Sequence, residues 1–191
     1  MTGLTFDAAS HSYTWQPTPD AVPVRLLSVT EALRRAGMVD TTGFNDNVRD
    51  RGSRVHQAVA FDHDGTLDEQ TAADVMPYVV TWRRFVAESG FSPKTWERPI
   101  ADPARGYAGT YDVVGSLAGR SALIDIKTGV PQPWVGAQLA AYARCLNDGP
   151  ARYCLHLTPE RYVLTEYRDR NDERLFLAAL TVATWQVQHG R

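Results

Sequence analysis

The residues best suited to chemistry lie in one stretch of the chain, between Gly109 and Tyr142. Asp112 falls on one strand-like run and Asp125 on the next, and the connection between the runs is short enough for an antiparallel hairpin. Side chains alternate in direction along a strand, so Asp125 and Lys127 are expected to share a face. Two carboxylates and an ammonium group would then meet at one place on a sheet.

These groups suit metal-dependent hydrolysis of a phosphodiester. Asp112 and Asp125 could hold Mg2+ or Mn2+, which polarises the scissile phosphate and acidifies a water molecule. Lys127 could assist the attacking hydroxide or stabilise the developing charge. Lys94 and Lys127 are the only lysines among 20 basic residues, and an ammonium can take part in proton transfer whereas a guanidinium stays protonated. A structural salt bridge is the alternative interpretation.

Further candidates lie on an expected helix over 48–61, where Gly52 and His56 are four positions apart and share a face. The glycine would leave room beside the imidazole for a metal or another ligand. The alternative is a packing glycine with a hydrogen-bonded histidine. Arg51 and Arg54 make this segment locally basic, which suits contacts with phosphate or, equally, a solvated surface.

Two more segments contribute candidates. Glu97, on an expected strand over 95–100, could join the metal site or be an exposed residue of an edge strand. An expected helix over 134–146 would place Gln138 and Tyr142 one turn apart on one face. There they could contact a phosphate, a base or the lysine, or they could be ordinary core and surface residues.

The remaining patterns predict the elements that must position these residues. A helix from Ser28 or Thr30 to Arg35 is expected because Ser28 and Glu31 have capping-box spacing. A polar loop is expected over 40–47 and a solvated turn over 62–69. The other expected elements are short strands at 4–6, 12–15 and 22–27 that form a hairpin lid, strands at 107–117, 121–127, 152–157 and 162–168, and amphipathic helices at 71–89, with a kink at Pro77, and at 171–187.

The chain as a whole fits one domain of 191 residues, with an N-terminal hairpin and helix over 1–47 and a motif-bearing core over 48–191. A net charge of -2 argues against a protein that coats nucleic acid, although a local arginine cluster could still bind phosphate. Cys145 and Cys154 form no C-x-x-C pair, so neither a zinc ribbon nor an all-cysteine iron-sulfur cluster is expected. Without a signal segment or a membrane-spanning run, we expect a soluble cytoplasmic protein.

Four motifs, in this order, resemble the PD-(D/E)XK nuclease superfamily and, within it, the RecB-like and Cas4-like exonucleases, including small phage-encoded members. They are Arg51-Gly52-x-x-x-His56, Gly109-x-x-Asp112, Asp125-x-Lys127-Thr128-Gly129 and Gln138-x-x-x-Tyr142. The resemblance implies an α/β (α+β) fold with a restriction-endonuclease-like core, in which helices flank a central mixed β-sheet. The four cysteines that hold an iron-sulfur cluster in Cas4 and some other relatives are absent here.

The resemblance also assigns roles. Mg2+ or Mn2+ would be the cofactor, Lys127 the catalytic lysine, and Gln138 and Tyr142 motif residues near the DNA, while the implied metal ligands are His56, Asp112, Asp125 and the Ile126 carbonyl. The implied function is an exonuclease in DNA recombination, repair or phage DNA processing. A structure-specific or restriction-like endonuclease and a non-cleaving DNA-binding or partner-binding module remain open. The expected partners are DNA and either a second copy of the chain or a recombination protein, with no membrane.

Overall fold

The computed structural model of the protein describes residues 3–39, 46–130 and 132–190. Its strands form one eight-stranded sheet in the order β1-β2-β3-β5-β6-β7-β8, with β4 also paired to β5. The strands are β1 (Gly3–Asp7), β2 (Ser12–Gln16), β3 (Val24–Ser28), β4 (Ser92–Asp102), β5 (Tyr107–Leu117), β6 (Arg120–Lys127), β7 (Ala151–Leu157) and β8 (Tyr162–Tyr167). The β3–β5 and β6–β7 pairs are parallel and the others antiparallel, so the sheet is mixed.

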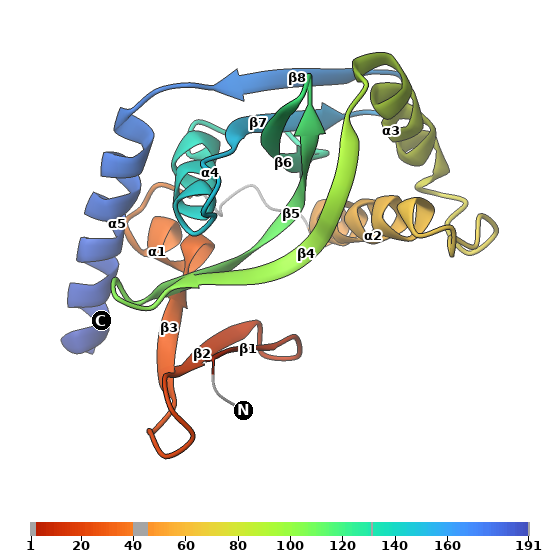
Figure 1. Cartoon of the computed structure of the whole chain (residues 1–191). Coiled ribbons are helices and arrows are strands. Elements are labelled where there is room, and N and C mark those ends of the chain that lie inside the picture. The colour runs from red at the N-terminus through yellow and green to blue at the C-terminus, as the bar shows by residue number, and fades with distance from the viewer. Residues whose placement is uncertain (1–2, 40–45, 131, 191) are drawn as a thin grey trace.

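Helices cover both faces of this sheet (Figure 1). The first hydrophobic cluster packs α1, α4 and α5 against one face, and the second packs α2 and α3 against the other. The helices are α1 (Val29–Arg35), α2 (Asp46–His63), α3 (Met76–Ser89), α4 (Val135–Arg144) and α5 (Asn171–Gln188). The expected mixed sheet flanked by helices is therefore confirmed. None of the described helices combines the length and apolar character that a membrane span requires.

The N-terminal strands form an antiparallel meander that joins the main sheet through a short parallel pairing of β3 with β5. The Tyr13 and Thr110 hydroxyls are 2.9 Å apart and link β2 to β5. The Ser28 side chain accepts a hydrogen bond from the Glu31 backbone N–H, which confirms the predicted start of α1. Most of the expected polar loop over 40–47 lies outside the described residues.

The helix predicted over 71–89 is wrong at its N-terminal end, because α3 begins at Met76 and residues 71–75 form turns. Pro77 lies in the first turn of this helix, where its missing N–H costs no intrahelical hydrogen bond, so it does not kink the helix. The Asp68 carboxylate accepts hydrogen bonds from the backbone and hydroxyl of Thr71 and so stabilises the preceding turn.

The hairpin that carries the candidate carboxylates is present as predicted, with Val113 opposite Ile124. Its turn consists of Ala118 and Gly119, whose φ angles of 51° and 77° are typical of the tight two-residue turns that match strand twist.

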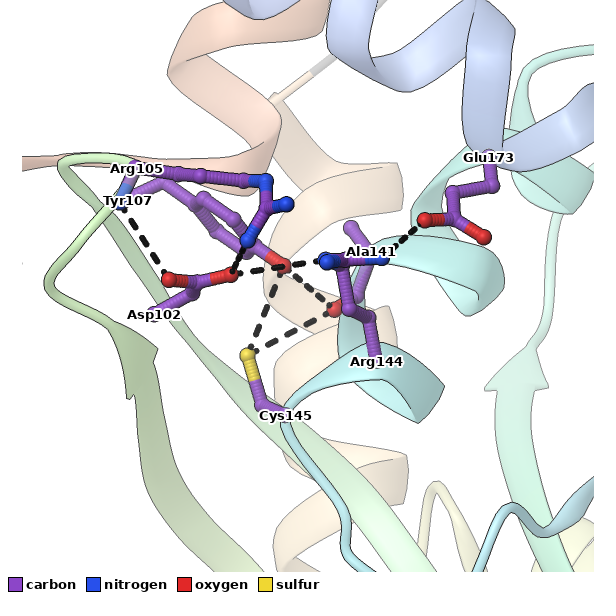
Figure 2. Close-up of polar contacts among 7 residues, drawn as sticks. All are labelled: Asp102, Arg105, Tyr107, Ala141, Arg144, Cys145 and Glu173. Carbon is purple, nitrogen blue, oxygen red and sulfur yellow. Dashed lines mark hydrogen bonds and ion pairs between the residues drawn. The ribbon is translucent and has the colours of Figure 1, made fainter.

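A polar network fixes the C-terminal end of α4 against the turn between β4 and β5 and against α5 (Figure 2). Asp102, at the end of β4, lies 3.4 Å from the Arg144 guanidinium, which also pairs with Glu173 of α5. The buried Tyr107 hydroxyl donates a hydrogen bond of 3.1 Å to the Ala141 carbonyl. These contacts hold α4, the helix with Gln138 and Tyr142, on the sheet.

Candidate metal centre

Three side chains from three separate elements converge at the start of the β5–β6 pairing. Their potential ligand atoms all lie within 4.8 Å of one another. The His56 Nδ1 atom of α2 is 3.4 Å from Asp112 Oδ1 of β5 and 3.7 Å from Glu97 Oε1 of β4. Two carboxylates and one imidazole are a donor set that suits Mg2+ or Mn2+.

The backbone of Ile126 orients two of these groups. The Ile126 N–H donates a hydrogen bond of 2.6 Å to Asp112 Oδ2, which leaves the other carboxylate oxygen to face His56. The Ile126 carbonyl is 2.8 Å from His56 Nε2. A carbonyl can only accept, so Nε2 carries the proton and Nδ1 is the nitrogen that can bind a metal. The Ile126 carbonyl, which the resemblance implies as a metal ligand, thus orients His56. Its second lone pair remains available for a metal ion.

Glu97 joins this cluster with an unusual backbone. It lies between Trp96 and Arg98, which pair with Val113 and Tyr111, so it sits opposite Asp112. Its φ of 46° lies in the left-handed region, although it is a residue within a strand. Such strain collects at functional sites. From the sequence, Glu97 could be either a metal ligand or an exposed residue of an edge strand, and the structure places it with His56 and Asp112.

Asp125 and Lys127 form a second pair beside this cluster. Asp125 is only 2% exposed and accepts a hydrogen bond of 2.8 Å from Lys127 Nζ through Oδ1. Its other oxygen, Oδ2, is 2.7 Å from the same Nζ atom, so both oxygens of this buried carboxylate face the ammonium. Asp125 is not a member of the three-residue cluster, and its carboxylate holds the lysine.

The charges of these groups are strongly coupled. Burial lowers the pKa of His56, but the facing Asp112 and Glu97 carboxylates outweigh this effect and raise it to about 10. Burial raises the pKa of Asp125 to about 6, against the attraction of Lys127. Burial also lowers the pKa of Lys127, but Asp125 and Asp112 raise it overall, so the ammonium stays charged. The site therefore holds positive charge where a divalent cation would replace the imidazole proton.

One face of α4 completes the site with Trp134, Gln138 and Tyr142, which follow one another at intervals of four residues. Gln138 Nε2 donates a hydrogen bond of 3.2 Å to the Tyr142 hydroxyl, and its buried Oε1 has no hydrogen-bond partner in the ranges that the structure describes. The Tyr142 ring packs directly on Gly109, where an added Cβ would lie 2.5 Å from Cε1. Trp134 is not among the candidates predicted from the sequence, although its helical spacing before Gln138 could have indicated it.

The arginines of α2 differ in their surroundings. Arg54 is exposed and bonds the Asp74 carboxylate at 2.5 Å, so it is already engaged in an ion pair. Arg51 is partly buried and lies 6.0 Å from the Tyr78 ring centroid, and within the described part of the chain its buried Nε has no hydrogen-bond partner. Gly52 faces the Thr128 hydroxyl, which lies 3.6 Å from where a Cβ would be. The start of α2 thus approaches the loop that follows Lys127.

This chain shows only limited similarity to known proteins. No family model matches the chain, and no curated protein matches it. The crystal structure of SSO0001 aligns with a TM-score of 0.43 and 16% identity over 83% of this chain and 75% of that one. An alkaline exonuclease, LHK-Exo from Laribacter hongkongensis, gives 0.49 and 16% over 86% and 89%. The same exonuclease in complex with dAMP gives 0.42 and 14% over the same shares. At these values the similarity does not assign the chain to a family.

Proposed function

We propose that this protein is a divalent-metal-dependent deoxyribonuclease of the PD-(D/E)XK superfamily that acts as an exonuclease. The observation that carries the proposal is the convergence of His56, Glu97 and Asp112 beside the buried Asp125–Lys127 pair. Five chemically suitable side chains from α2, β4, β5 and β6 thus meet at one end of a hairpin. A structural salt bridge would account for the lysine and its carboxylate, but not for the three facing ligand groups.

In this proposal Mg2+ or Mn2+ would be held by Asp112, Glu97 and His56, and Asp125 and the Ile126 carbonyl are the other candidate ligands. When bound, the ion supplies Lewis-acid polarisation of the scissile phosphate. The ammonium of Lys127 orients the attacking water and stabilises charge that develops on the phosphate oxygens. Asp125 holds that ammonium in place through the 2.8 Å hydrogen bond.

The assignment of DNA as the substrate rests on the resemblance of the sequence motifs to PD-(D/E)XK nucleases and on the position of the arginines of α2. Arg51 lies five residues before His56 on α2, and its Nε has no hydrogen-bond partner among the described residues, so it is our first choice for a phosphate contact. Arg54, Gln138 and Tyr142 are further candidates for substrate contacts. None of the described elements presents a row of base-reading side chains, so we expect little sequence specificity. The proposed setting is DNA recombination, repair or phage DNA processing.

The test uses end-labelled linear DNA and closed circular DNA, each with Mg2+, with Mn2+ and with chelator. Asp112→Ala and Lys127→Ala are the inactivating variants, and Lys94→Ala is the matched control because Lys94 is the chain's other lysine and is exposed. We expect metal-dependent loss of the linear DNA only, abolished by the first two substitutions and retained by the third. Nicking of the circular DNA would show that the protein is an endonuclease rather than an exonuclease. Binding of DNA without cleavage under every metal condition would contradict the proposal that the protein is a nuclease.

A further inference from the structure

The Lys127 side chain has a second neighbour besides Asp125. Its Nζ atom lies 5.7 Å from the centroid of the Trp134 indole ring, and the face of an indole attracts a cation at this range. Trp134 is 7% exposed, so the ring forms a buried wall beside the lysine. The ammonium is therefore held between a carboxylate on its own strand and an aromatic ring on α4.

The indole is placed here by the helix rather than by a hydrogen bond of its own. Trp134 is the N-cap residue of α4, and its buried Nε1 has no hydrogen-bond partner among the described residues. What the side chain offers the lysine is thus its ring face. A phenyl ring would offer the same kind of face without the unsatisfied donor, and an aliphatic side chain of similar bulk would offer none.

We propose that Trp134 is a positioning residue that holds the ammonium of Lys127 at the candidate metal centre. A lysine side chain is a flexible four-carbon stem that ends in a compact charge, and Asp125 contacts this charge from one side only. The Trp134 ring limits its movement from a second element. The role in catalysis rests on the proposed nuclease function, whereas the contact itself can be measured without any activity.

The contact can be measured because the chain has only two lysines. In protein labelled with 13C-lysine, the ε-CH2 groups of Lys94 and Lys127 give two signals, which Lys94→Arg assigns. The indole ring current should shift the Lys127 signal upfield of the exposed Lys94 signal. We expect Trp134→Phe to keep an upfield shift and Trp134→Leu to lose it. Trp82→Leu removes an equally buried tryptophan of the other hydrophobic cluster and should leave the Lys127 signal in place.

The catalytic part is tested by steady-state kinetics on linear DNA. If Trp134 positions Lys127, Trp134→Leu should lower kcat by about 10- to 100-fold, the size expected for a displaced catalytic group, with KM within about twofold of the original. Trp134→Phe should recover most of kcat. Circular dichroism and the melting temperature establish that each variant is folded, and Trp134→Met replaces the leucine variant if that one does not fold.

Each result has one meaning. An unshifted Lys127 signal in the original chain, or one that Trp134→Leu leaves unchanged, would overturn the contact. A shift that disappears while kcat stays within twofold would overturn the positioning role, as would a phenylalanine variant as impaired as the leucine variant. A wild-type chain with the expected shift but no nuclease activity would contradict the proposed function and leave the contact standing.

Discussion

Glu97 brings its carboxylate to His56 and Asp112 with a backbone φ of 46°. A non-glycine residue in this region costs roughly 1–3 kcal/mol, and it persists only where the surrounding structure imposes it. Here the register on both sides of Glu97 matches β5, so the neighbouring pairs fix the backbone and the side chain faces the cluster. The strain is understandable if the carboxylate has a function that a regular strand position would not serve.

The first prediction concerns this carboxylate. Glu97→Gln keeps the size of the side chain and removes its charge, so Mn2+ affinity should fall at least about tenfold, in line with the cost of losing a metal-site group. Isothermal titration calorimetry of the folded variant measures the change. Glu160→Gln, in the exposed turn between β7 and β8, is the control and should bind Mn2+ as the original chain does. Equal affinities for the Glu97 variant and the control would remove Glu97 from the site.

At the scale of elements, α4 and β5 meet through a glycine. Gly109 lies in β5, and the Tyr142 ring fills the space where a side chain would begin. A Cβ there would lie 2.5 Å from the ring and 3.3 Å from Val29 Cγ2, on a residue of α1. Because Tyr142 is buried, the ring cannot swing into solvent to relieve the contact. The glycine therefore sets how closely α4 approaches the strand that carries Asp112.

The second prediction follows from this packing. Gly109→Ala should lower the free energy of unfolding by about 1–3 kcal/mol, the usual cost of overpacking a core, as measured by urea denaturation. Gly129→Ala is the matched control for stability, because an added Cβ there would have no described residue within 4 Å. The double variant with Tyr142→Ala should cost less than the sum of the two single changes, since the clash requires both side chains. Strict additivity would show that Gly109 and Tyr142 are not coupled.

At the scale of the whole molecule, the candidate metal centre exists only in the folded chain. Its potential ligand groups come from α2, β4 and β5, and from positions 56, 97 and 112. In the unfolded chain these groups are far apart on average, so a metal ion should bind the native state much more tightly. Binding of this kind raises the free energy of unfolding by linkage. The site also gathers three carboxylates, whose charge the His56 imidazolium and the Lys127 ammonium balance only in part, so a bound cation adds favourable electrostatic interactions.

The third prediction is that Mn2+ or Mg2+ raises the melting temperature. At a free metal concentration of 100 times Kd, the free energy of unfolding should increase by about 2.7 kcal/mol. Differential scanning fluorimetry at constant ionic strength measures the shift, and excess chelator should reverse it. Asp112→Asn should melt at the same temperature with and without metal. A metal-induced shift of the same size in this variant would show that the ion binds elsewhere.

Several features could be predicted from the sequence because they depend on local periodicity. The hairpin that carries Asp112 and Asp125 follows from two alternating runs with a short connection, and the structure confirms it. Asp125 and Lys127 share a face because strand side chains repeat every two residues. The start of α1 follows from the Ser28 cap. The start of α3 was mispredicted because the apolar pattern continues through the turns at 71–75, which Asp68 stabilises by accepting hydrogen bonds from Thr71.

Other features were decided only by the tertiary structure. Glu97 could not be assigned because its left-handed backbone and its distance to His56 depend on how β4 pairs with β5 and where α2 packs. The contact between Trp134 and Lys127 likewise depends on the docking of α4 onto β6. Sequence alone thus determined which chemical groups this protein has and which of them share a strand or a helix face. The packing of separate elements decided which groups meet, because contacts between distant segments have no periodicity in the sequence.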